Sequence, residues 1–175
     1  MRKRLESVKR IGRKIGLNED KGYAVAIFLA LIIVSATVIG YYVAFKPQPE
    51  RYNTIYLLDS QKKAIGYPEV LVANQNSTFN VYVNVVNHMG GTGNQTYQVL
   101  VKITPNFSSA PVDTQPIQTY DISLRDGDKW QNSVAITQNQ VGSYSVVFEL
   151  WHYNQDSKAY EFTPNYCVLK IQVTS

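Results

Sequence analysis

The sequence predicts an all-β fold, an immunoglobulin-like antiparallel β-sandwich ectodomain preceded by a single transmembrane α-helix, and three observations support this. Residues 23–45 form one continuous apolar run without a charged side chain. The residues after it alternate apolar and polar side chains in seven to eight short stretches, the pattern of half-buried strands. Turn residues separate these stretches, and no stretch with a helical period interrupts them.

The apolar run 23–45 has the length and composition of a membrane-spanning helix. At about 1.5 Å per residue it extends roughly 34 Å, enough to cross a hydrocarbon core of about 30 Å. Tyr23 at one end, and Tyr41 and Tyr42 at the other, are expected at the two membrane interfaces, where amphipathic rings prefer the head-group depth. The lipid bilayer is therefore an expected partner of the chain.

Basic residues are concentrated before the apolar run. Residues 1–22 contain eight basic and three acidic side chains, whereas residues 46–175 contain nine and ten. The positive-inside rule then predicts a single-pass protein of the cell membrane, with a basic cytoplasmic N-terminal segment and the C-terminal domain outside. Because the net charge of +4 comes from this flank, it does not indicate nucleic-acid binding.

The basic segment 1–22 has two open interpretations. Its apolar residues recur at helical spacing, which predicts a short amphipathic helix lying on the anionic inner leaflet. Gly12 and Gly16 weaken such a helix and favour a topology signal without ordered structure.

The fate of the apolar run also has two interpretations. The run is longer than the about 7 to 15 apolar residues of a secretory signal, and no A-x-A site follows it, so we expect a retained anchor. The pair Lys21-Gly22 before the run is similar to the class III leader of archaeal pilins and archaellins, which is cut after the glycine. A pilin-like subunit, processed after Gly22 and assembled through its helix, is the alternative.

Two prolines in residues 46–51 predict an extended linker, so the β domain is expected at residues 52–175. The stretches 79–87 and 97–103 are expected to pair as an antiparallel hairpin of central strands, with Val83 and Val101 buried and Asn84 exposed. The full set of expected strands is 54–59, 70–73, 79–87, 97–103, 117–124, 130–137, 143–153 and 166–173.

Two connections carry strong turn signals. Residues 105–116 contain three prolines, which predicts a surface connection that can take the chain from one sheet to the other. Residues 125–129 contain Asp126-Gly127 and are expected to form a hairpin turn. The acidic pair Asp126 and Asp128 is explained by this turn rather than by calcium binding.

The residues that bear chemistry do not form a catalytic or metal-binding pattern. Cys167 is the only cysteine, and its phase with Leu169 and Ile171 predicts a buried structural thiol. His88, His152 and Cys167 have the composition of a cupredoxin copper site, but no His or Met closely follows the cysteine. Hydrolase, metalloprotease and phosphate-loop motifs are missing from the sequence, so we expect no enzyme activity, cofactor or metal.

Three N-x-S/T sequons occur after the apolar run, at Asn76, Asn94 and Asn106. Their positions, before a strand, in a glycine-containing loop and beside a proline, suit exposed acceptors. We expect these three residues to be available for N-glycosylation.

Short motifs follow one another along the domain. They are Leu57-Leu58-Asp59, Gly66-Tyr67-Pro68, Val85-Val86-Asn87-His88, Thr96-Tyr97-Gln98-Val99, Gly142, Tyr144 and Phe148-Glu149-Leu150-Trp151. In order and spacing these motifs resemble those of an uncharacterised family of archaeal membrane proteins, domain of unknown function 1616. The resemblance covers about residues 54–173 and implies membrane residence with no known activity, so it assigns no catalytic residues. Several members of that family carry more than one span, unlike this chain.

The function expected from these features is that of a non-catalytic binding or structural module of the cell envelope, or an accessory subunit of a membrane complex. The polar loops 88–95 and 106–115 are the exposed candidates for recognition, since glycines in the first and prolines in the second suit close contact with little loss of entropy. The alternative is that both loops are solvated connections. The expected partner is an envelope or membrane protein whose identity the sequence does not specify.

Overall fold

The computed structural model of the chain describes residues 19–45 and 50–175, and it divides the chain into two compact units, residues 1–49 and 50–175. The hypothesis of an amphipathic helix before residue 19, and most of the expected linker 46–51, lie outside the described residues. The two units are described one at a time below.

The first unit contains one long helix, α2 (Glu19–Ala44). Its large apolar side chains are all exposed, from 42% at Val25 to 73% at Tyr23. The hydroxyl of Thr37 donates to the carbonyl of Ile33 at 2.8 Å, so this polar group is satisfied within the helix. The helix is long and apolar enough to cross a membrane, a property that membrane anchors and signal sequences share.

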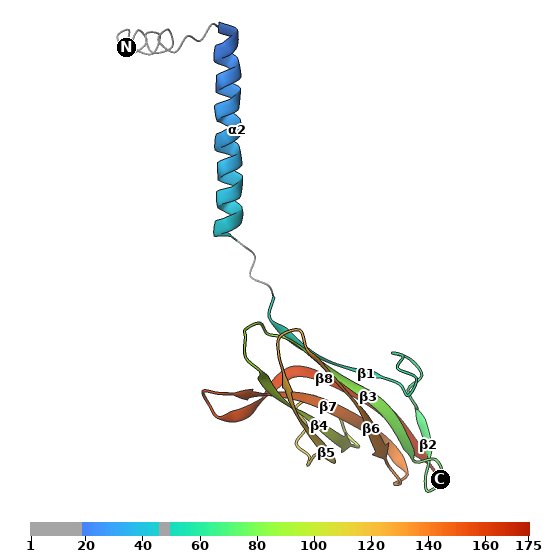
Figure 1. Cartoon of the computed structure of the whole chain (residues 1–175). Coiled ribbons are helices and arrows are strands. Elements are labelled where there is room, and N and C mark those ends of the chain that lie inside the picture. The colour runs from blue at the N-terminus through green and yellow to red at the C-terminus, as the bar shows by residue number, and fades with distance from the viewer. Residues whose placement is uncertain (1–18, 46–49) are drawn as a thin grey trace. The chain divides into compact units, whose positions relative to one another are not determined.

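The second unit is an antiparallel β-sandwich, which confirms the predicted fold class (Figure 1). A three-stranded sheet has the order β1-β3-β6, and a five-stranded sheet has the order β2-β8-β7-β4-β5. The pair β2 and β8 is parallel, and the other neighbours are antiparallel. The strands are β1 (Tyr52–Leu58), β2 (Val70–Val72), β3 (Thr78–His88), β4 (Gln95–Thr104), β5 (Gln118–Leu124), β6 (Lys129–Thr137), β7 (Gly142–Asn154) and β8 (Ala159–Thr174).

The core lies between the two sheets and is built from the inward positions of each alternating stretch. Burying a valine-sized side chain contributes about 1.5 to 3 kcal/mol, and β-branched side chains also suit the extended backbone. The fully buried core residues are Val81, Val83 and Val85 of β3, Tyr97, Val99 and Val101 of β4, Val134 and Ile136 of β6, Val146, Phe148 and Leu150 of β7, and Val173 of β8.

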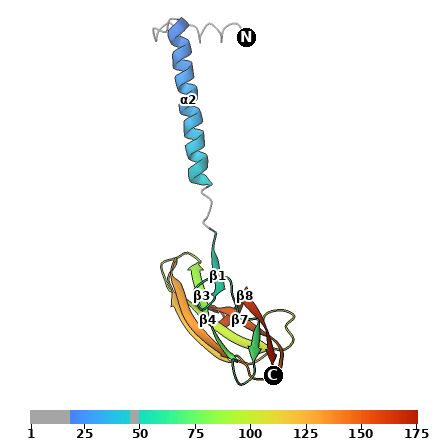
Figure 2. The same ribbon diagram turned by 90° about the vertical axis from the view of Figure 1, so that its right-hand side faces the viewer.

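The hairpin expected between 79–87 and 97–103 is wrong. The strands β3 and β4 belong to different sheets, as Figures 1 and 2 show from two directions. Val83 and Val101 are both fully buried. They lie in opposite sheets, each with its side chain directed into the core, and are not neighbours in one sheet. The valine-rich inner face is the same in both arrangements, so the alternation alone could not distinguish them.

Asn84 is fully buried, which corrects the expectation that it is exposed. It lies on the outer face of β3, the central strand of its sheet, between Tyr56 of β1 and Gln131 of β6. The amide of Gln131 donates to the Asn84 side-chain oxygen. Neighbours on both sides therefore cover a polar side chain that alternation assigns to solvent.

The connection 105–116 does not take the chain between sheets, because β4 and β5 pair in the same sheet. Between β1 and β8 the chain changes sheet five times, and the two changes nearest this connection lie between β3 and β4 and at the turn between β5 and β6. The turn at residues 125–128 is therefore an inter-sheet turn and not the hairpin expected from Asp126-Gly127.

Asn87 connects these two inter-sheet segments. Its backbone N–H donates to Asp128, and its carbonyl accepts from Gly127 at 2.7 Å. Its buried side chain donates to the Leu124 carbonyl and accepts from the Tyr97 hydroxyl at 2.9 Å. A single polar residue thus satisfies the backbone where the chain leaves and re-enters the sheets.

The strand β8 begins at Ala159, earlier than the expected start at residue 166, and it contains Pro164. The pairing of β7 and β8 shifts between Glu149 and Trp151, beside this proline. Proline cannot donate to a ladder, and a local irregularity accommodates it. Residues 155–158 form the turn between β7 and β8, and residues 159–165, which lie before the expected strand, are a bent continuation of β8.

One open side of the sandwich is closed by side chains rather than by backbone pairing. The carbonyls of Asn53, Ile55 and Leu57 in β1 accept from Asn165 at 3.1 Å, from Cys167 at 3.4 Å and from Tyr67 at 2.8 Å. These contacts block part of the β1 edge against pairing with another strand.

Candidate functional site

The connection 105–116 is fastened to the outer face of the five-stranded sheet by a buried ion pair. Lys102 of β4 and Glu149 of β7 lie 2.9 Å apart, with side chains 7% and 0% exposed. The Lys102 ammonium also donates to the carbonyl of Val112 at 2.6 Å, and Glu149 accepts from the Val112 N–H at 2.5 Å. We call this arrangement the clasp, because two side chains of the sheet bond the backbone N–H and the backbone carbonyl of one residue of the connection.

Glu149 makes a further bond in the clasp, accepting from the Trp151 indole N–H at 3.0 Å. The Lys102 ammonium lies 5.8 Å from the centroid of the same indole. The buried carboxylate is thus bonded to an ammonium, a backbone amide and an indole, which offsets the cost of removing its charge from water.

Reasoning from sequence missed the clasp. Lys102 and Glu149 occupy outward positions in alternating stretches, where a charged side chain is ordinarily solvated. They are diagonal neighbours in the sheet, since Lys102 is opposite Val147 and Glu149 is opposite Leu100. Only the register of two strands far apart in the sequence brings them together.

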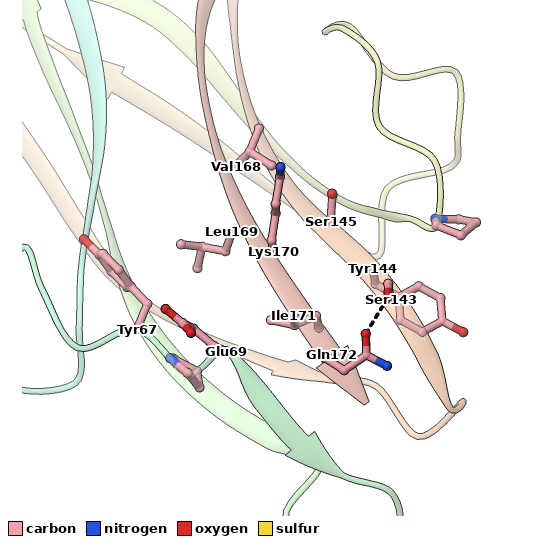
Figure 3. Close-up of a pocket in the computed structure, with 12 residues that line it drawn as sticks. Tyr67, Glu69, Ser143, Tyr144, Ser145, Val168, Leu169, Lys170, Ile171 and Gln172 are labelled. Atoms are coloured by element: carbon pink, nitrogen blue, oxygen red, sulfur yellow. Dashed lines mark hydrogen bonds between the residues drawn. The ribbon is translucent and has the colours of Figure 1, made fainter. Parts of the chain in front are cut away.

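A second feature is an open groove of about 520 Å³ over β8 and β7. Figure 3 shows the side chains of both strands that line it, with Tyr67 and Glu69 beyond β8. The Ser143 hydroxyl donates to the side-chain oxygen of Gln172. Because an amide is not a base, this contact does not activate the serine as a nucleophile.

The candidate copper ligands have separate structural roles. The His88 ring packs on Tyr52 with centroids 4.8 Å apart, whereas a ring nitrogen of His152 bonds Gln95 at 2.8 Å. The Cys167 thiol donates to the backbone carbonyl of Ile55. Among residues 19–45 and 50–175, no group of three His, Cys, Asp or Glu side chains could hold a metal ion.

Burial determines the acid–base properties of several side chains. It raises the pKa of the Cys167 thiol to about 11 and that of the Tyr97 hydroxyl to about 12. Burial also lowers the pKa of His152, whereas the nearby Glu161 carboxylate acts in the opposite direction. Cys167 is thus a neutral thiol at neutral pH, and most of its surface is buried.

The acidic residues Asp126 and Asp128 serve the inter-sheet turn. Asp126 accepts from the Gly90 N–H at 2.9 Å, and Asp128 accepts from the Arg125 N–H at 3.1 Å. Gly90 and Gly127 have φ values of 72° and 81°, which favour glycine at both positions. The bonds tie loop 88–95 to the turn, so this loop is braced by its neighbours.

The sequons and the expected interface tyrosines are exposed. Asn76, Asn94 and Asn106 all lie on the surface of the sandwich. The Asn94 amide donates to the Ser123 hydroxyl at 3.1 Å. Tyr23, Tyr41 and Tyr42 are 66% to 73% exposed near the ends of α2.

The fold and these sites define a class of protein, an immunoglobulin-like β-sandwich module in a chain that also carries an apolar helix. The family model for the domain of unknown function DUF1616 matches residues 46–166. The chain belongs to this family, which confirms the resemblance seen in its motifs. A search of curated proteins gave no match.

Solved structures with a similar arrangement include a CARDB domain from Pyrococcus furiosus in a crystal structure with di-metal ions. It is 17% identical, the match covers 72% of this chain and 90% of that chain, and the TM-score is 0.47. The solution structure of that domain is 16% identical over 72% and 97% of the chains, with a TM-score of 0.47. A β-glucosidase from Listeria innocua is 12% identical over 70% of this chain and 16% of its own, with a TM-score of 0.42.

Proposed function

We propose that this protein is a non-catalytic recognition module of the cell envelope, anchored in the membrane by α2, which presents its β-sandwich outside the cell. The observation that carries the proposal is that α2 exposes its whole apolar surface. Such a surface is stable in lipid and costly in water. The sandwich has a complete core of its own, so the helix is not needed to fill it.

The orientation follows from charge, because eight basic residues precede the apolar run 23–45 within reach of its end. A non-catalytic role is supported by the clasp, in which the buried Lys102 and Glu149 are both committed to holding the connection 105–116. The proposed partner is an envelope or membrane protein bound through the outer surfaces and loops, with the chain as an accessory subunit of its complex.

Cysteine labelling in intact cells tests the anchor and its orientation. Cys167 is replaced by serine, and single cysteines are introduced by Ser175→Cys and, separately, by Arg2→Cys. An impermeant maleimide is expected to label position 175 in intact cells and position 2 only after lysis. Labelling of position 175 only after lysis would contradict the orientation.

Sequencing of the mature N-terminus tests the anchor against its alternative. A retained anchor yields membrane-bound chains that still contain residues before Gly22. A mature chain that begins at Tyr23 would instead support the pilin-like subunit assembled through its helix.

Crosslinking and mass spectrometry of the membrane-bound protein then identify its partner, and a protein without any membrane or envelope partner would contradict the accessory role.

A further inference from the structure

A hollow of about 370 Å³ lies beside the clasp on the outer face of the five-stranded sheet. Trp151 forms one wall, and residues 111–115 of the connection form another. The volume falls within the roughly 300 to 1,000 Å³ of ordinary small-molecule sites. Exposed polar side chains of Asp113, Thr114 and Gln115 line it, so a ligand would meet an aromatic ring and several hydrogen-bonding groups together.

The clasp holds both walls of this hollow in place. Glu149 bonds the Trp151 indole with one oxygen, and with the other it bonds the N–H of Val112. Lys102 fixes the carbonyl of the same residue. A buried ion pair is weak evidence for stability, but here it positions a ring and a polar segment before any ligand arrives, which reduces the cost of binding.

Aromatic side chains continue away from Trp151 along the same face. Trp151 packs on Phe162 with centroids 5.6 Å apart, Phe162 lies 6.5 Å from Tyr166, and Tyr166 lies 6.0 Å from Phe107. We call these four residues the aromatic strip. Tyr166 is 42% exposed, so the strip offers ring surface outside the hollow.

The charges beside the hollow select against ionic ligands. The Lys102 ammonium already lies over the indole ring, in the position that a ligand cation would take. Glu149 balances the charge of this ammonium, so the pair does not attract an anion. Asp113, the carboxylate that lines the hollow, repels an anion. The hollow thus offers an aromatic surface and hydrogen-bonding groups to a ligand without net charge. A sugar has these properties, because its C–H groups pack on aromatic faces and its hydroxyls bond polar side chains.

We propose that this hollow binds a neutral oligosaccharide, with one sugar ring against Trp151 and between the polar residues 113–115, and further units along the aromatic strip. The proposal rests on the proposed function, since it names the chemistry that an extracytoplasmic recognition module would meet. It requires no catalytic step.

Isothermal titration calorimetry of the full chain, in a detergent without a sugar head group, tests binding with maltohexaose, cellohexaose and chitohexaose as probes. At least one probe is expected to bind. Trp151→Ala is expected to weaken binding by roughly 30-fold or more, since a central aromatic contact is worth about 2 kcal/mol. Gln115→Ala, which alters an exposed side chain and leaves the fold intact, is expected to weaken it by roughly fivefold to tenfold.

Tyr52→Ala is the matched control, because Tyr52 is 47% exposed and lies on the other sheet. It is expected to leave affinity unchanged, whereas Tyr166→Ala weakens binding of the hexasaccharide more than of the corresponding disaccharide. Failure of all three probes to bind, or equal binding by the wild type, the Gln115 variant and the Tyr166 variant, would overturn the saccharide site. The labelling and N-terminal sequencing are independent of this result, so failure of the anchored module is distinguished from failure of the site.

Discussion

At the scale of single residues, Cys167 shows how burial controls chemistry. The thiol donates to a backbone carbonyl of β1, and burial raises its pKa from the ordinary 9.0 to about 11. Tyr97 is likewise raised from 10.0 to about 12. Both groups are neutral acids whose pKa values are higher in the folded state than in the unfolded state.

The pH dependence of stability follows from the raised pKa values of Cys167 and Tyr97. Below about pH 9 both groups are protonated in the folded and in the unfolded state, so their contribution to the stability of the fold is fully present. As pH rises through the unfolded and then the folded pKa values, the unfolded state releases protons first, and stability is lost between about pH 9 and 12. Urea unfolding of the wild type and of Cys167→Ser is the measurement, and the serine variant is expected to lose less stability over this range.

Thiol labelling provides a second check on Cys167. At pH 8 the native protein is expected to react with iodoacetamide much more slowly than the urea-unfolded protein, because the native thiolate is scarce and its surface is mostly buried. Equal rates for the two forms would show that the β8–β1 contact opens readily.

Val83 and Asn80 test the inner and outer faces of β3. Val83→Asp places a carboxylate in the core without a partner and is expected to cost at least about 3 kcal/mol of unfolding free energy. Asn80→Asp changes an exposed residue of the same strand and is expected to change stability by less than about 0.5 kcal/mol. Chemical denaturation measures both, and similar losses would contradict the orientation of β3.

At the scale of elements, the clasp makes the connection 105–116 part of the five-stranded sheet. Proline-containing connections are often variable surface segments, but here Val112 is bonded on both sides to side chains of β4 and β7. Val147, an outward residue of β7 that lies opposite Lys102, is also fully buried. The outer face of this sheet therefore has a local core of its own.

Removal of one partner of the clasp is expected to be worse than removal of both. Glu149→Gln leaves the Lys102 ammonium buried beside a neutral group and is expected to cost about 3 to 5 kcal/mol. The double variant Lys102→Met/Glu149→Leu removes both charges and is expected to recover most of that loss. Urea denaturation measures stability, and limited proteolysis at residues 105–116 measures release of the connection.

The two readouts separate stability from positioning. The double variant is expected to be cut at the connection faster than the wild type, since Val112 loses both partners. If it were as unstable as Glu149→Gln, the ion pair would contribute net stability, and its role would not be limited to holding the connection.

At the scale of the whole molecule, the chain combines an exposed apolar helix with a sandwich that has its own core. A fragment of residues 50–175 is therefore expected to be soluble without detergent and to unfold in one cooperative transition. Its urea midpoint is expected to match that of the sandwich in the full chain, because the core residues all come from the second unit. Aggregation of the fragment, or a markedly lower midpoint, would mean that the helix supports the fold.

The amino-acid sequence by itself determined the apolar helix, the positions of most strands and the inward side chains of the clearly alternating strands. These are local properties, since charge-free length specifies α2 and alternation within one stretch specifies which face of a strand is apolar. The family was also recognisable from short motifs in order along the chain. Cys167 was predicted to be a buried structural thiol for the same local reason, its phase with Leu169 and Ile171, and in the structure it is partly buried.

Only the tertiary structure decided which strands are neighbours and which side chains therefore come into contact. Alternation is the same whether β3 pairs with β4 or faces it across the core, so the sheet assignment depends on the summed packing of all strands. The burial of Asn84, the bonds of Asn87 and the clasp between Lys102 and Glu149 all arise between residues distant in sequence. Their partners are set by strand register, which no single stretch of the sequence encodes.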